Sequence, residues 1–314
     1  MRKQTLGATG IEVSELSLGT WGLSGDGYGP APVEQAKSVM ERARAMGITL
    51  FETSQSYGRG TTETELGATV AQDKEVTIVT KWGTDRSASV TRKRFDVDYL
   101  KQSLESSKER LGKDARIIAL LHNPSETALK DGSALGTLKE MHEQGDLVSY
   151  GVSVGNEAVA RAALEASAPV LSFAYNALVV QPLRSMMSLL EEKNTGVLVH
   201  SVLFYGLLTG QWSMNRTFRS TDHRSERWPE GTLATRVRHL DALRPMISGE
   251  VTSMRSAALR FVLENPRVHS AILGPRMSGQ LDQMVRDVQG ERPLLSPAKL
   301  TAFEARLQQL EVPR

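Results

Sequence analysis

Short apolar runs alternate with amphipathic segments along the whole chain. Eight runs rich in β-branched and aliphatic residues predict strands, at 16–21, 50–54, 76–81, 116–121, 148–154, 171–178, 196–203 and 270–275. The segments between them have helical spacing, as in 32–47, where Pro32 stands at the start and Gly47 at the end. In 95–112, Leu100, Leu104 and Leu111 keep the same spacing. Regular alternation of strand and helix predicts parallel strands joined by crossover helices.

Eight such units predict a closed (β/α)8 TIM barrel, and 314 residues lie within the usual length range of that fold. The alternative α/β architecture is an open doubly wound sheet, which places a G-x-G-x-x-G turn after the first strand. The segment SLGTWGLSGDG, residues 17–27, is rich in glycine but lacks that spacing. We therefore expect the barrel.

Three segments lie outside the eightfold pattern. The opening TLGATGIEVS, residues 5–14, predicts an N-terminal β-hairpin that turns at residues 8–10. Residues 204–243, after the seventh strand, are polar and rich in arginine and predict a long loop. Residues 296–310 predict an extra C-terminal helix capped by Ser296. Because no linker or low-complexity tract divides the chain, we expect a single domain over residues 1–314.

Composition narrows the class of protein. Hydrophobic residues make up 40% and charged residues 24%, which is typical of a globular protein. The formal net charge is only +2, so no basic excess indicates nucleic-acid binding. Without cysteine the chain has no disulfides, thiol nucleophiles or cysteine-bound metals. No segment resembles a signal peptide or a membrane span, so we expect a cytoplasmic protein that needs neither a membrane nor a metal.

Polar side chains stand at the predicted carboxyl ends of three neighbouring strands, where barrel enzymes place their active sites. Glu52 and then Tyr57 follow the second strand, Lys81 ends the third, and His122 ends the fourth. Each residue alone fits a structural role, such as a rim charge or turn packing. Together they suit proton transfer to a developing alkoxide, because a neighbouring ammonium lowers the pKa of a phenol. The hydride must come from elsewhere, which implies a nicotinamide cofactor.

The motifs around these residues resemble those of the aldo-keto reductase family over nearly the whole chain. FETSQSYG, residues 51–58, followed by TETELG, residues 62–67, is similar to the family patterns F-D-T-A-x-x-Y-G and S-E-x-x-L-G. LSLGTWG, VTIVTKWG, LLHNPS and VLVHSVLFYGLLTG extend the resemblance. It implies that Tyr57 donates a proton, that Lys81 tunes the Tyr57 pKa, and that His122 orients the carbonyl. Glu52 would keep Lys81 charged.

The resemblance also implies an NADP(H) site. It places Arg276 beside the adenosine phosphate and His200 against the nicotinamide ring. The residues implied for the cofactor are Gly19, Thr20, Ser153, Ser172, His200, Ser201, Leu203, Gly206, Gly274, Arg276 and Gln280. An arginine just before a helix that opens at Ser278 independently favours a phosphate site. Trp21 and Trp82 are expected to wall an apolar substrate pocket.

The chain departs from the family pattern at six positions. Glu52 replaces an aspartate, Val154 an asparagine, Ser172 a glutamine and His200 a tyrosine, and Gln283 and Met284 stand where the adenine motif has an acidic residue and an asparagine. We expect an NADP(H)-dependent oxidoreductase that reduces an aldehyde or ketone, keto-sugars included. The alternatives are a nicotinamide-binding sensor or scaffold subunit with little turnover and a Schiff-base aldolase that uses Lys81. The sequence leaves open which carbonyl compound is the substrate and what the oligomeric state is.

Overall fold

Eight parallel strands form a closed barrel in the computed structural model, which describes residues 1–87, 89–228 and 231–310. The strands are β3 (Leu16–Gly19), β4 (Leu50–Glu52), β5 (Thr77–Trp82), β8 (Arg116–His122), β9 (Ser149–Ser153), β10 (Val170–Ala174), β11 (Gly196–His200) and β12 (Ser270–Leu273). Each strand pairs with the next along the chain, and β12 pairs with β3 to close the ring. The predicted (β/α)8 barrel is confirmed.

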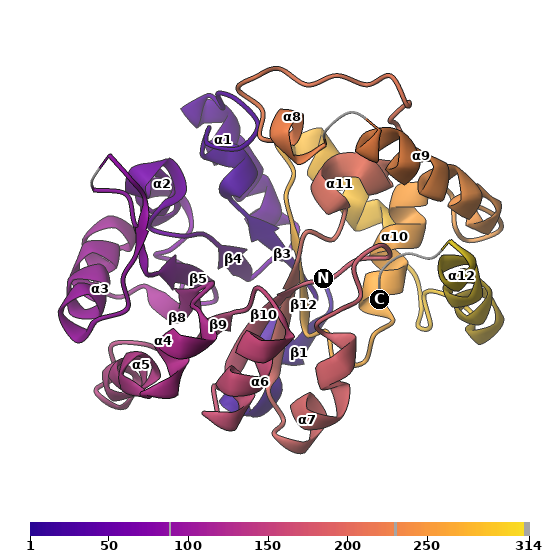
Figure 1. The fold of residues 1–314 in the computed structure, drawn as a ribbon. Helices are drawn as coiled ribbons and strands as arrows, with labels where there is room; N and C mark the ends of the chain where they lie inside the picture. Colours follow the sequence, from indigo (N-terminus) through magenta and orange to yellow (C-terminus); the bar gives the residue numbers. More distant parts are fainter. Residues whose placement is uncertain (88, 229–230, 311–314) are drawn as a thin grey trace.

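Helices surround the barrel on its outer face (Figure 1). They are α1 (Val33–Ala45), α2 (Thr61–Thr69), α3 (Val97–Leu111), α4 (Glu126–Lys130), α5 (Ser133–Glu143), α6 (Glu157–Glu165), α7 (Met187–Glu192), α10 (Met254–Leu263) and α11 (Ser278–Asp287). Helix α1 begins just after Pro32, and Leu100, Leu104 and Leu111 of α3 are buried, as their spacing predicts. Within the described residues, no helix is both long and apolar enough to cross a membrane.

The interior of the barrel is closed at one end and polar at the other. The predicted hairpin, β1 (Lys3–Thr5) and β2 (Glu12–Ser14), packs Leu6 and Ile11 with the inward side chains of the strands, among them Leu50 and Val79. Gln4 Nε2 donates to the carbonyl oxygen of Val268 just before β12 (3.3 Å), which places the hairpin at the N-terminal end.

Side chains alternate along each strand, so positions two residues beyond those apolar groups face the same interior at the opposite end. The inward positions at that end are Gly19, Glu52, Lys81, His122, Ser153, Ser172, His200 and Gly274. The C-terminal end of the barrel is therefore its polar mouth.

The segment after β11 differs from the expected loop. It begins with the 3₁₀ segment η5 (Phe204–Thr209) and contains the short helix α8 (Arg224–Arg227), but its last third is the helix α9 (Thr232–Leu243). Leu233, Val237 and Leu240 of α9 are buried, so a helical apolar stripe was present among the arginines. The prediction of a loop through residue 243 is wrong there. The C-terminal helix α12 (Pro297–Gln309) is confirmed, and it lies beside α9 (Figure 1).

Candidate active site at the mouth of the barrel

A buried ion pair joins β4 and β5 at the mouth. Glu52 and Lys81 are only 7% and 4% exposed, and the Glu52 carboxylate contacts Lys81 Nζ directly. Lys81 Nζ also donates to the carbonyl oxygen of Thr53 (2.9 Å). The absence of a side chain at Gly19 leaves space for Glu52, which is one methylene longer than the aspartate of the family pattern. A Cβ at position 19 would lie 3.2 Å from Glu52 Oε2. The extra methylene of Glu52 therefore does not prevent the expected pair.

Tyr57 lies against this pair. It opens the 3₁₀ turn η3 (Tyr57–Gly60) that follows β4. Lys81 Nζ is 4.8 Å from the centroid of the Tyr57 ring, and the His122 ring centroid is 6.2 Å away. The phenol, the ammonium and the imidazole, which come from or follow three adjacent strands, thus meet at one end of the barrel.

Burial controls the protonation of these groups. Burial raises the pKa of the Tyr57 phenol, and the nearby Tyr205 phenol adds to that rise. Burial also lowers the pKa of Lys81 well below its usual value. Burial outweighs the lowering effect expected from the Lys81 ammonium, so the net shift of the Tyr57 pKa in this structure is upward. Tyr57 therefore holds its proton at neutral pH, as a proton donor must.

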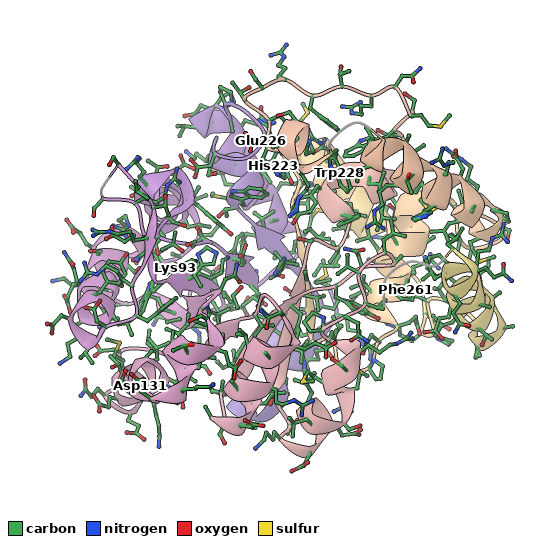
Figure 2. All side chains as sticks on the ribbon, in the orientation of Figure 1. Lys93, Asp131, His223, Glu226, Trp228 and Phe261 are labelled. Atoms are coloured by element: carbon green, nitrogen blue, oxygen red, sulfur yellow. The ribbon has the colours of Figure 1, made fainter. Side chains whose placement is uncertain are left out.

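His122 is oriented by groups that the sequence analysis missed. The two-stranded hairpin β6 (Thr84–Asp85) and β7 (Arg92–Lys93) follows β5. Thr84 Oγ1 lies 3.1 Å from His122 Nδ1, and Lys93 Nζ donates to Thr84 Oγ1 (2.8 Å) and to the carbonyl oxygen of His122 (2.6 Å). Lys93 therefore links the hairpin to the end of β8 (Figure 2). Burial lowers the pKa of His122, and the charges of Lys81 and Lys93 lower it further, so the imidazole is neutral.

These contacts are compatible with an arrangement of protons that leaves Nε2–H available. A lysine ammonium only donates, so Thr84 Oγ1 accepts from Lys93 and its own hydroxyl hydrogen is free to reach His122 Nδ1. With Nδ1 as the acceptor, the neutral ring carries its hydrogen on Nε2. Ser54 Oγ, 3.3 Å from Nδ1, donates to the carbonyl oxygen of Lys81 (2.9 Å).

A second ion pair holds the Tyr57 turn from both sides. Asp26, in the loop after β3, accepts from the backbone N–H of Gly58 through Oδ2 (2.7 Å) and from Arg86 Nη1 (3.0 Å). Arg86 Nη1 also donates to the carbonyl oxygen of Ser56 (2.8 Å). The two residues that flank Tyr57 are therefore fixed by one pair of side chains. Neither Asp26 nor Arg86 belongs to a sequence motif that could have identified it.

The other half of the mouth presents the residues expected to bind a cofactor. Ser153 and Ser172 are each 3% exposed and are opposite each other in the β9–β10 register. His200 Nδ1 lies 3.0 Å from Ser201 Oγ, and burial lowers the pKa of His200 to about 4, so a neutral flat ring faces the interior. Thr20 Oγ1 is buried and has no hydrogen-bond partner among the described residues. This orphaned hydroxyl fits a ligand that supplies the missing partner.

The backbone after β11 is held in an uncommon conformation. Ser201 has φ +58°, a left-handed value that is rare outside glycine, and its carbonyl oxygen accepts from Asn176 Nδ2 (2.9 Å). Leu203 is 8% exposed, and Gly206 follows in η5 with φ +98°. At Gly274, after β12, an added Cβ would meet nothing within 4 Å, so open space adjoins the backbone there.

Arg276 joins two loops at the cofactor side. Its Nη1 donates to the carbonyl oxygen of Tyr28 (2.7 Å), and its Nη2 donates to those of Gly29 (3.2 Å) and Pro30 (2.7 Å). Its backbone N–H donates to Gln280 Oε1 (2.8 Å). Arg276 Nε is buried without a partner among the described residues, which leaves one donor for an anion. These contacts to the loop after β3 go beyond the phosphate contact expected of Arg276 from the sequence.

The two candidate substrate-pocket tryptophans differ in placement. Trp21 belongs to an aromatic cluster, with its ring centroid 5.2 Å from that of Tyr28 and 4.7 Å from that of His223, a residue labelled in Figure 2. Trp82 is fully buried, and its Nε1 donates to Ser107 Oγ of α3 (3.0 Å). The expectation that Trp82 walls the substrate pocket is wrong, because Trp82 follows the inward Lys81 directly and so faces outward.

Comparison with known proteins agrees with this fold. The model of the aldo/keto reductase family matches residues 15–294, so the chain belongs to that family. Members of the family are generally oxidoreductases that use nicotinamide cofactors. The chain is 26% identical to the aldo-keto reductase YhdN of Bacillus subtilis (strain 168) over 297 residues, which are 90% of this chain and 88% of YhdN.

Two further similarities cover almost the full length. The chain is 24% identical to a probable voltage-gated potassium channel subunit beta of Oryza sativa subsp. japonica, over 98% of this chain and 97% of the rice protein. Among solved structures, a glycerol dehydrogenase from Gluconobacter oxydans matches with a TM-score of 0.83 and 23% identity, over 100% of this chain and 96% of that one. At that identity the structural match shows the shared fold alone.

Proposed function

We propose that the protein is an NADP(H)-dependent oxidoreductase that reduces an aldehyde or ketone to an alcohol, with Tyr57 as the proton donor. One observation carries the proposal. The Tyr57 ring lies 4.8 Å from Lys81 Nζ and 6.2 Å from the His122 ring, at the mouth of a barrel whose other inward residues fit a nicotinamide. Membership of the aldo/keto reductase family supports the reaction class.

The nicotinamide, when bound, supplies the hydride. The residues that would hold the cofactor are Gly19, Thr20, Ser153, Ser172, His200, Ser201, Leu203, Gly206, Gly274, Arg276 and Gln280. Thr20 and Arg276 each offer a buried donor that lacks a partner among the described residues. The neutral ring of His200 is suited to stack on a flat heterocycle.

The protein's own residues handle the proton. His122 Nε2–H donates to the carbonyl oxygen of the substrate and orients it beside the Tyr57 hydroxyl. As negative charge develops on that oxygen, Tyr57 transfers its proton and becomes a phenolate. Lys81, held by Glu52 and the carbonyl oxygen of Thr53, stabilises this phenolate because opposite charges at close range favour the ionised form. The raised pKa of Tyr57 keeps the phenol protonated until the alkoxide forms.

A second candidate function is a nicotinamide-binding subunit with weak or no turnover. The similarity to the rice protein, whose name describes a channel subunit, favours it, as does the short Ser172 at a position where the family has a glutamine. The intact set of Tyr57, Lys81 and His122 favours the enzyme.

Titration of the purified protein with NADPH and NADH, followed by addition of an aldehyde, tests the proposed function. We expect NADPH to bind more tightly than NADH and to be consumed after aldehyde is added. Arg276→Ala should weaken NADPH binding at least about tenfold and leave NADH binding nearly unchanged, because a guanidinium pairs with the extra phosphate. Arg286→Ala, in the last turn of α11, is the matched control.

Two outcomes would contradict parts of the proposal. Tight NADPH binding without consumption of any aldehyde or ketone tested would favour the binding subunit. Equal affinities for NADPH and NADH in the parent protein would show that Arg276 does not select the phosphorylated cofactor.

A further inference from the structure

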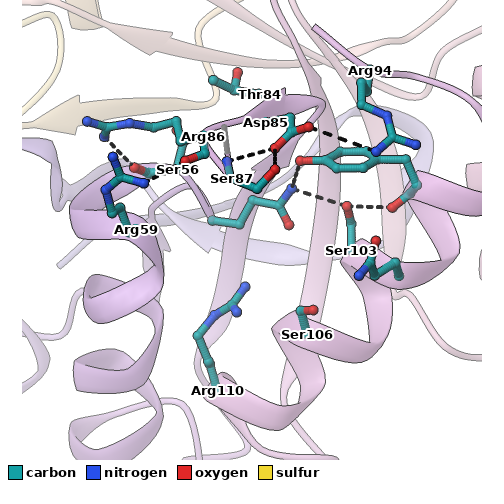
Figure 3. Close-up of a pocket in the computed structure, with 13 residues that line it drawn as sticks. Ser56, Arg59, Thr84, Asp85, Arg86, Ser87, Arg94, Ser103, Ser106 and Arg110 are labelled. Atoms are coloured by element: carbon teal, nitrogen blue, oxygen red, sulfur yellow. Dashed lines mark hydrogen bonds and ion pairs between the residues drawn. The ribbon is translucent and has the colours of Figure 1, made fainter. Parts of the chain in front are cut away.

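A cleft of about 320 Å³ lies on the outer side of the barrel, between the turn that carries Tyr57, the β6–β7 hairpin and helix α3 (Figure 3). Of the thirteen described residues that line it, none is aliphatic and none is a lysine. Four are arginines from separate parts of the chain, Arg59, Arg86, Arg94 and Arg110. Neither Tyr57 nor His122 lines the cleft, which adjoins the mouth of the barrel through Thr84 and Arg86.

Asp85 is the one carboxylate among the described lining residues, and its Oδ2 lies 3.9 Å from Arg94 Nη1. Asp85 is only 4% exposed, and its Oδ1 accepts from the backbone N–H (2.8 Å) and the hydroxyl (2.6 Å) of Ser87. Three of the four arginines have acidic partners: Arg94 Nε lies 3.2 Å from Asp96 Oδ2, Arg110 Nε lies 2.7 Å from Glu63 Oε2, and Arg86 Nη1 lies 3.0 Å from Asp26 Oδ2. These pairs fix the three guanidinium groups in place around the cleft.

Arg59 and Arg86 retain unused donors. Within the described residues, Arg59 makes its hydrogen bond through Nη1, to the carbonyl oxygen of Arg86 (2.5 Å). Arg86 uses Nη1 as well, toward Asp26 and Ser56. The Nε and Nη2 groups of both side chains are left for a ligand. That edge of a guanidinium matches the two oxygens of a carboxylate or phosphate.

The backbone at Arg59 is also unusual. Arg59 has φ +54°, in the left-handed region that side chains with a Cβ rarely adopt. Such strain persists only where the surrounding structure imposes it. Here it accompanies the contact between Arg59 and the hairpin.

A rigid neutral wall completes the cleft. Gln55 Nε2 donates to the hydroxyl of Tyr99 (3.1 Å) and to Ser103 Oγ (3.1 Å), and Ser103 Oγ donates to the carbonyl oxygen of Tyr99 (2.8 Å). Ser106 stands beside them on α3 (Figure 3). These hydrogen bonds hold the wall in position without a ligand, as in most preformed small-molecule sites.

We propose that this cleft is a second binding site, for a small molecule that carries a phosphate or carboxylate group. The guanidinium groups of Arg59 and Arg86 bind the anionic group. The amide and hydroxyl groups of the wall contact the other polar groups of the ligand. The inference goes beyond the proposed function, because it concerns a site that the reduction does not use.

Calorimetric titration with inorganic phosphate and, separately, with succinate tests this site, at an ionic strength held constant with sodium chloride. We expect saturable binding of at least one of the two anions at one site per chain. Arg59→Asn should weaken that binding at least tenfold, and asparagine tolerates the left-handed backbone at this position. Arg161→Asn on α6 is the matched surface control and should leave binding unchanged.

Two further variants keep the outcome decisive. Arg276→Ala should leave the anion affinity unchanged, which separates the cleft from the expected cofactor phosphate site. If the thermal melt shows that Arg59→Asn does not fold, Arg94→Gln tests the site instead, because Arg94 lines the other side of the cleft. Absence of saturable binding of both anions, or binding unchanged in Arg59→Asn and Arg94→Gln, would overturn the proposal. Loss of binding in Arg276→Ala alone would assign the anion to the cofactor site and overturn it as well.

Discussion

At the scale of single residues, the mechanism depends on the buried pair of Glu52 and Lys81. Removing one partner of a buried ion pair costs roughly 3–5 kcal/mol, because the other charge is left in a poorly solvated site. We expect Glu52→Gln to lower the free energy of unfolding by about 3 kcal/mol, at the lower end of this range. The cost is small for a buried pair because burial lowers the pKa of Lys81, so the unpaired ammonium can lose its proton. Carbonyl reduction should slow at least about tenfold, because an uncharged Lys81 no longer stabilises the phenolate of Tyr57.

Glu52→Asp is the matched variant, because it keeps the charge and shortens the side chain by one methylene. It should retain more stability and more turnover than Glu52→Gln. Urea unfolding and kcat measured on the same preparations check both effects. A Glu52→Gln protein as stable and as active as the parent would show that the pair is dispensable.

At the scale of elements, three loops cooperate to place the proton donor. Asp26 and Arg86 hold Ser56 and Gly58, the residues on either side of Tyr57. We expect Arg86→Met to lower kcat about ten- to a hundredfold, because small displacements of a reacting group are costly. Arg86→Lys should restore part of the rate, and KM and NADPH affinity should change little. Steady-state kinetics of the variants provide the measurement.

Arg92→Met is the control, since Arg92 is exposed and its guanidinium contacts only the neighbouring Asp85 among described residues (3.4 Å). A rise in KM with unchanged kcat in Arg86→Met would instead place Arg86 in substrate binding.

The same scale explains what the sequence could predict. The eight apolar runs and the helical segments between them were sufficient to predict the barrel. The positions of Glu52, Lys81 and His122 at the ends of adjacent strands were sufficient to predict that their side chains lie close together. Thr84 and Lys93 were missed because strands of two residues have no periodicity to detect. Asp26 and Arg86 lie in loops, where long-range contacts rather than local pattern decide the partners.

Two errors were avoidable in physical terms. Lys81 and Trp82 are consecutive in one strand, so both could not face the interior. In α9, Leu233, Val237 and Leu240 keep helical spacing among the surrounding arginines, so the sequence already contains the signal for a helix there. The pKa of Tyr57, by contrast, depends on burial, which only the folded structure reveals.

At the scale of the whole molecule, buried histidines make stability depend on pH. Burial lowers the pKa of both His200 and His223 to about 4 from a usual value of 6.5. Between these values the unfolded chain binds more protons than the folded protein, so the free energy of unfolding rises with pH. This contribution is complete above pH 6.5 and is lost as the pH falls toward 4.

His200→Gln should therefore flatten the dependence of the unfolding free energy on pH in that interval. Urea unfolding at several pH values measures the slope, and His142→Gln on the exterior helix α5 serves as the control. An unchanged slope in His200→Gln would mean that the pKa of His200 is the same in the folded and the unfolded protein.

The central claim is that Tyr57 donates the proton, and Tyr57→Phe tests it most directly. Tyr150→Phe is the matched control, because Tyr150 packs against His142 of α5 outside the barrel, with ring centroids 5.9 Å apart. We predict that Tyr57→Phe lowers kcat for carbonyl reduction by on the order of a hundredfold or more, while its NADPH dissociation constant and that of Tyr150→Phe stay near the parent value. Turnover retained in Tyr57→Phe, or NADPH binding lost together with turnover, would contradict the account.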